Sequence, residues 1–134
     1  MTDKLPTGPD PDGSDAGYWE GLRAGVLRLP RCSDCGTFRP VSRILCGSCH
    51  SFATSWEEVP ARGSVYSWVR SHRAFLPELD EPTPYVTVLV QLADLPVRLL
   101  GLFRGDETRI GDDVVGVIED VANADWPVLR WRAA

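Results

Sequence analysis

Four cysteines in two pairs limit what this chain can fold into more than any other feature of its sequence. Cys32 and Cys35 enclose two residues, Cys46 and Cys49 enclose two more, and ten residues separate the pairs. Each pair can form a tight knuckle, so that four thiolates converge on one tetrahedral metal ion. A site with four protein ligands has no open position for water, and we therefore predict a structural zinc centre.

Disulfides and a redox centre are weaker interpretations of the four cysteines, whereas an iron site stays open. Two disulfides would suit a secreted chain, but no apolar stretch follows Met1, so we expect no signal peptide and a reducing compartment. A redox Cys-x-x-Cys normally occurs once, beside a βαβ pattern that is not visible here. Iron stays open as the bound metal, because four thiolates can hold either ion.

The residues beside the cysteines complete the predicted knuckles. Gly36 follows the first knuckle and Gly47 lies inside the second, and we expect positive φ at both because glycine has no Cβ. His50 directly follows Cys49 and is interpreted as a surface residue rather than a substitute ligand. This part of the chain is too short to bury a large core, so metal binding should supply most of its folding free energy.

Length and charge exclude several functional classes. The chain has 134 residues and a formal net charge of -5. No run approaches the roughly 18 apolar residues that a membrane span needs. An acidic chain is also poorly suited to nucleic acid, since such binding depends on phosphate neutralisation by Lys and Arg. We expect a cytoplasmic protein with neither a membrane nor a nucleic-acid partner.

The pattern along the chain predicts three parts. Residues 1–14 are rich in Pro, Gly and Asp and should form a flexible tail. Residues 15–55 should form a helix followed by the zinc ribbon, and residues 56–134 a barrel.

The predicted ribbon part begins with a short helix, capped by Ser14 or Asp15 and ending near Ala24. Residues 27–31 should then lead as a strand into the first knuckle, and residues 38–41 should be the return strand. Four arginines make this part locally basic, and we interpret them as a solvated face: Arg28, Arg31, Arg39 and Arg43.

The barrel part carries a series of short strands. Residues 56–59 should open it, and residues 60–63 read as a turn or bulge. Five β-rich segments follow, at residues 64–70, 85–92, 97–103, 114–121 and 128–131. Five short strands of this length fit a small closed barrel, and the fold class is therefore mainly β with an OB-fold.

A search for catalytic residues finds none. Only His50 and His72 are available as bases near neutral pH, and no carboxylate is placed by spacing to orient either. The chain therefore reads as an accessory subunit. Two other classes stay open: a single-stranded nucleic-acid module that stacks bases on Tyr66 and Trp68, and electron transfer through a four-cysteine iron site.

The order of motifs resembles a known family. It is carried by the aromatic helix at residues 18–22, the two cysteine pairs, the segments at residues 63–67, 84–86 and 110–114, and the closing residues 127–131. In this order they resemble the zinc-ribbon plus OB-fold acyl-CoA-associated proteins, long catalogued as a domain of unknown function. The resemblance covers nearly everything after about residue 15.

This resemblance implies a rubredoxin-like ribbon, a C-terminal OB barrel and metal ligation by Cys32, Cys35, Cys46 and Cys49. Its members accompany thiolase-superfamily enzymes, and some accompany thiolase-like aldolases or hydratases that shorten steroid side chains. The resemblance therefore implies a role in lipid metabolism, beside a thiolase-like enzyme acting on acyl-CoA thioesters. We expect a heterotetramer with two copies of each chain and acyl-CoA bound at the complex.

Two further expectations concern named side chains. Arg98, Arg104 and Arg109 are candidates to bind acyl-CoA phosphates, because a guanidinium fork matches phosphate oxygens. Small domains cannot bury all their large side chains, so the five tryptophans should be partly exposed. We expect Trp56 and Trp68 in or under the barrel, and the other three at a partner interface: Trp19, Trp126 and Trp131.

Overall fold

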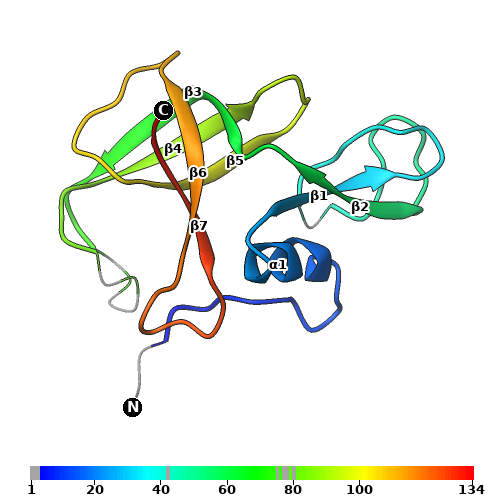
Figure 1. Cartoon of the computed structure of the whole chain (residues 1–134), viewed down its shortest axis with the longest axis horizontal. Helices are drawn as coiled ribbons and strands as arrows, with labels where there is room; N and C mark the ends of the chain where they lie inside the picture. The colour runs from blue at the N-terminus through cyan, green and yellow to red at the C-terminus, as the bar shows by residue number, and fades with distance from the viewer. Residues whose placement is uncertain (1–3, 42, 75, 77–78, 80) are drawn as a thin grey trace.

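A computed structural model describes residues 4–41, 43–74, 76, 79 and 81–134. Figure 1 shows a barrel with a smaller two-stranded sheet projecting from one side and a helix between the two. The structure is mainly β, as the sequence predicts. No helix in the described ranges is both long and apolar enough to cross a membrane.

Helix α1 spans Ala16–Arg23 and ends as the sequence predicts. Two bonds close its last turn, from the Gly25 N–H to the Leu22 carbonyl (3.0 Å) and from the Val26 N–H to the Gly21 carbonyl (2.8 Å). This pair of bonds is the Schellman motif. Asp15 occupies the N-cap position, but its carboxylate makes no cap hydrogen bond to the helix backbone.

The projecting sheet pairs β1 (Leu27–Cys32) with β2 (Thr54–Val59) in antiparallel register. The predicted return strand at residues 38–41 is wrong, because only one bridge joins Arg31 to Phe38. Pro40 has no N–H to continue that pairing. Strand β2 takes the place of the return strand, so residues 56–59 belong to this sheet and not to the barrel.

Five antiparallel strands form the barrel, as predicted. They are β3 (Arg62–Ser71), β4 (Tyr85–Leu92), β5 (Arg98–Phe103), β6 (Asp113–Glu119) and β7 (Val128–Ala133). They close in the order β3-β4-β5-β7-β6, with one parallel contact between β5 and β7. A five-stranded closed barrel with such a crossover is an OB-fold.

Gly63 allows β3 to pair with two neighbours at once. It lies opposite Leu92 on β4 and Val114 on β6. A Cβ at this position would lie 2.1 Å from the backbone oxygen of Gln91, so only glycine fits without backbone movement. The break predicted at residues 60–63 is confirmed at Pro60 and Ala61, which separate β2 from β3, whereas Gly63 lies within β3 and the bulge follows at Tyr66.

The barrel and the projecting sheet share one hydrophobic core. Alternate residues of β4 point inward, as the period-2 pattern of a strand requires, and Trp131 is completely buried. Leu22 of α1 and Leu27 and Leu29 of β1 join the same buried cluster. The helix thus fixes the position of the cysteine-bearing part on the barrel.

The segment before α1 runs beside the β6–β7 connection. The Leu5 N–H donates to the Asn123 carbonyl at 3.0 Å, and the Lys4 ammonium lies 3.0 Å from the Asp125 carboxylate. Residues 1–3 lie outside the described residues. Flexibility of residues 1–14 stays a prediction.

Candidate functional site

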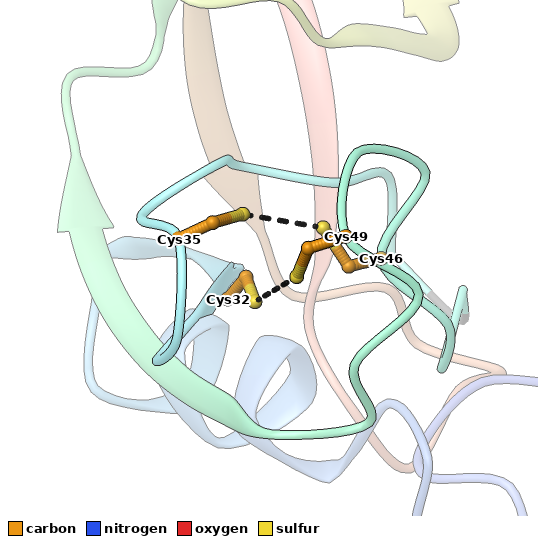
Figure 2. Close-up of side chains that lie close together, drawn as sticks. All are labelled: Cys32, Cys35, Cys46 and Cys49. Atoms are coloured by element: carbon orange, nitrogen blue, oxygen red, sulfur yellow. Dashed lines mark hydrogen bonds between the residues drawn. The ribbon is translucent and has the colours of Figure 1, made fainter.

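The four cysteine sulfurs form one compact group. They all lie within 4.8 Å of one another, with 3.6 Å between Cys32 and Cys49 and 3.5 Å between Cys35 and Cys46 (Figure 2). These separations are far too long for a disulfide, whose sulfurs lie about 2.05 Å apart. A tetrahedral zinc with bonds of about 2.3 Å has sulfur–sulfur edges of about 3.8 Å. The group therefore fits a zinc ion.

The two knuckles repeat one backbone pattern. In each, the residue after the second cysteine donates its N–H to the carbonyl of the first: Gly36 to Cys32 at 2.9 Å and His50 to Cys46 at 3.0 Å. Both donors have positive φ, +79° and +61°. The prediction for Gly36 is confirmed. The prediction for Gly47 is wrong, because the left-handed turn follows the second cysteine rather than lying between the pair.

The electrostatics of the sulfurs favour a cation among them. The Cys49 N–H hydrogen bond lowers the pKa of Cys46 to about 6, and the Cys35 N–H lowers the pKa of Cys32. The Ser51 N–H favours the Cys49 thiolate, but the sulfurs of Cys32 and Cys35 outweigh it and raise the pKa of Cys49 to about 12. A bound metal removes this conflict, because it deprotonates each coordinating thiol.

Arg39 connects the two sides of the second knuckle. Its Nη1 donates to the Ile44 carbonyl before the knuckle, and its Nη2 donates to the Ala53 carbonyl after it and to Thr54 Oγ1. Only 2% of Arg39 is exposed, so its interpretation as part of a solvated face is wrong. A visible signal was its place in the apolar segment between Phe38 and Pro40.

With this geometry established, comparison with known families identifies the two parts. Residues 19–55 match the model of the ChsH2 rubredoxin-like zinc ribbon domain, and residues 56–119 match that of the ChsH2 C-terminal OB-fold domain. The chain belongs to the ChsH2 zinc-ribbon and OB-fold family. The resemblance predicted from the motif order is thereby confirmed, and the four cysteines of the ribbon are positioned for a structural zinc ion.

Two curated relatives are similar to this chain. A probable enoyl-CoA hydratase alpha subunit of Thermomonospora curvata is 30% identical over 122 residues, covering 90% of this chain and 34% of the relative. The 3-oxo-4,17-pregnadiene-20-carboxyl-CoA hydratase alpha subunit of Mycobacterium tuberculosis is 29% identical over 127 residues, covering 92% and 39%. The chain thus spans little more than a third of the length of these relatives.

Two solved structures share the fold. A chain of the Ltp2-ChsH2(DUF35) aldolase superposes with a TM-score of 0.78 at 28% identity, covering 90% of this chain and 94% of that one. A DUF35 family protein of unknown function from Sulfolobus solfataricus superposes with a TM-score of 0.62 at 18% identity, covering 94% and 87%. The second likeness shows the fold alone.

The three arginines predicted to contact acyl-CoA are not brought together. Arg98 begins β5 and Arg104 follows its last residue, so their backbones lie about 20 Å apart at the usual rise of a strand. Arg109 is exposed in the connection to β6. Arg98 stacks over the Tyr66 ring at 3.7 Å. A phosphate contact at any of the three stays a prediction.

Arg104 already has two carboxylate partners. Its Nη2 lies 2.8 Å from Glu119 and its Nη1 lies 2.9 Å from Glu81. The hydrogen bonds to Glu119 raise the pKa of Arg104, and those same bonds lower the pKa of Glu119. Any phosphate bound at Arg104 would compete with both carboxylates.

The expected exposure of tryptophan is wrong in part. Trp131 is completely buried in the barrel. Trp126 lies beneath the guanidinium of Arg23, whose Cζ is 3.4 Å from the centroid of the Trp126 ring. Trp56 packs against Gly17 of α1, since a Cβ there would lie 2.1 Å from the ring. Other apolar side chains are exposed instead: Ile44, Leu45, Phe52, Tyr66, Val69, Leu76, Leu100 and Ile110.

Sequence reasoning also missed Arg130, of which only 8% is exposed. It lies on β7 between Leu129 and Trp131, two core residues, and so points to the outer face of the barrel. Alternation along the strand could have marked it as outward-facing. Nothing in the sequence could have marked it as buried.

Proposed function

We propose that this chain is a non-catalytic accessory subunit that binds and supports a thiolase-like enzyme acting on acyl-CoA thioesters. The observation that carries the proposal is the similarity to the ChsH2 chain of the Ltp2-ChsH2(DUF35) aldolase, which extends over 94% of that chain. The accessory chain would stabilise its enzyme partner and complete its surface.

The proposed substrate class is a CoA thioester with a bulky acyl group of the steroid side-chain type. Both curated relatives are named as CoA-thioester hydratase subunits, and one name specifies a pregnadiene carboxyl-CoA. A heterotetramer with two copies of each chain remains our proposal for the assembly. Acyl-CoA would bind at the complex, with Arg98, Arg104 and Arg109 as candidates for phosphate contacts.

The proposed role of the metal is structural. Cys32, Cys35, Cys46 and Cys49 would ligate one zinc ion, which holds the two knuckles together and leaves no position for a substrate. The chain itself would hold the site in place, because backbone N–H groups orient the sulfurs and Arg39 fixes the second knuckle. Freshly purified protein should therefore contain one equivalent of zinc.

Co-expression with a thiolase-like enzyme from the same genome tests the proposal. The two chains should elute together in size-exclusion chromatography, and the enzyme alone should be poorly soluble or weakly active. Separate elution at micromolar concentrations, with full activity in the enzyme peak, would contradict it. Co-elution with a hydratase chain instead would assign the accessory role to that enzyme class.

A further inference from the structure

A small cavity lies where β5, β7, α1 and the segment before the helix meet. Its volume is about 250 Å³. Its lining combines aromatic, aliphatic and cationic side chains from these four segments and Leu79 from the β3–β4 connection, including Pro6, Tyr18, Trp19, Leu100, Gly101 and Arg130. Neither the cysteine centre nor the three predicted arginines contribute to it.

Arg130 is a buried cation with unused hydrogen-bonding capacity. Its Nε is buried and has no hydrogen-bond partner in the described part of the chain. Glu81 and Glu119 act on its charge from a distance, but among the described residues both carboxylates form ion pairs only with Arg104. A buried donor left unpaired costs about 1–3 kcal/mol, so an acceptor from outside the chain would be bound with that advantage.

Tyr18 also lines the cavity and carries a hydroxyl that can donate a hydrogen bond. Burial raises its pKa to about 12, an effect that the charge of Arg130 partly opposes, so the hydroxyl stays protonated near neutral pH. Among the described residues that line the cavity, the guanidinium and the neutral hydroxyl provide donors, and none provides an anionic acceptor. This donor set fits a carboxylate, whose two oxygens match the guanidinium fork.

The cavity opens onto an apolar face of the barrel. Leu100 lines the cavity, is 71% exposed, and lies opposite Leu89 on the neighbouring strand. Val69 and Tyr66 are also exposed on β3, the next strand across. Exposed apolar side chains on the same face of a sheet are typical of a protein interface, with a charged group at a buried position giving specificity.

The cavity is small and open to solvent, so an occupant can enter it from outside the chain. A volume of 250 Å³ equals that of about eight water molecules, enough for a carboxylate and a few carbon atoms. An aspartate or glutamate side chain projecting from an apolar surface fits both the cavity and the face around it.

We propose that this cavity is a carboxylate-binding site, in which Arg130 and Tyr18 receive an acidic side chain of the enzyme partner docked on the outer β3–β4–β5 face. The inference rests on the proposed function, because the occupant is the thiolase-like enzyme. The inference assigns the docking surface to the barrel and the anchoring contact to one ion pair, between Arg130 and a carboxylate of the enzyme partner.

The test measures the Kd between the full chain and the co-expressed thiolase-like enzyme from the dissociation of the co-purified complex on dilution. Arg130→Gln should raise the Kd at least about 30-fold, the usual effect of removing one partner of a buried charge pair. Tyr18→Phe removes only the hydroxyl and should raise the Kd about tenfold. Arg132→Gln makes the same charge change two residues further along β7 and should change it less than about twofold.

Stability measurements separate binding from folding. In the free chain, Arg130→Met should leave the thermal midpoint unchanged or raise it, because it removes an unpaired buried donor. A large fall in the midpoint would make Arg130 a structural residue and overturn the proposal. Should Arg130→Gln fail to fold, Tyr18→Phe still decides the question.

The outcomes distinguish this inference from the proposed function. If the wild-type chain binds the enzyme and both cavity variants bind equally well, the docking site is wrong while the accessory role stands. If the wild-type chain does not bind, both fail. If the chain self-associates and Arg130→Gln abolishes that association, the occupant of the cavity is a second copy of the chain. If propionate binds the cavity but does not change the Kd for the enzyme, the occupant is a small acid. Either result would overturn the proposal.

Discussion

Replacing Arg39 by glutamine should loosen the cysteine centre without touching a ligand. Arg39 donates to the Ile44 and Ala53 carbonyls and to the Thr54 hydroxyl, all from a position that is 98% buried. A shorter amide can reach at most one of these acceptors. Each acceptor left unpaired in the interior costs about 1–3 kcal/mol.

A buried cation also carries a desolvation cost of several kcal/mol, which the substitution removes. Two facts make the lost bonds outweigh this gain. The guanidinium holds carbonyls on both sides of the second knuckle, and four thiolates around a divalent ion leave a net negative charge nearby. We expect the free energy of unfolding to fall by about 2–5 kcal/mol, a large part of a typical domain's total.

Urea unfolding and zinc release to a chromogenic chelator measure the two consequences. Arg39→Gln should unfold at lower urea concentration and lose zinc faster than the wild type. Arg43→Gln is the matched control, because Arg43 lies in the same loop and is exposed. Equal urea midpoints and equal release rates for the two variants would refute this account of Arg39.

Three other outcomes are expected. Cys32→Ser should reduce bound zinc well below one equivalent and disorder the ribbon while the barrel keeps its strands, as elemental analysis and circular dichroism would show. Gly63→Ala should lower the thermal midpoint strongly, because a Cβ would lie 2.1 Å from the Gln91 oxygen. Glu119→Gln should reduce stability at neutral pH but not in acid, which unfolding measured at several pH values would detect. Arg104 lowers the folded pKa of Glu119, so the contribution of the Glu119 carboxylate to stability is lost as pH falls through that folded pKa.

The sequence by itself determined the features that are encoded locally. A Cys-x-x-Cys pair folds into a knuckle through bonds within five residues, so Cys32, Cys35, Cys46 and Cys49 predicted the centre without any distant contact. A content rich in β-branched and aromatic residues likewise predicted the five barrel strands, because these side chains fit the pleated, half-buried surface of a strand. These signals depend only on neighbours along the chain.

Only the tertiary structure decided which segments lie opposite one another. Strand β2 pairs with β1 rather than with the barrel, although it directly precedes the first barrel strand along the chain. Arg39 and Arg130 are buried because other segments cover them, the second knuckle in one case and α1 in the other. Alternation reports the face on which a side chain lies. What covers that face comes from other segments, five to 15 residues away for Arg39 and more than a hundred for Arg130, and alternation carries no information about them.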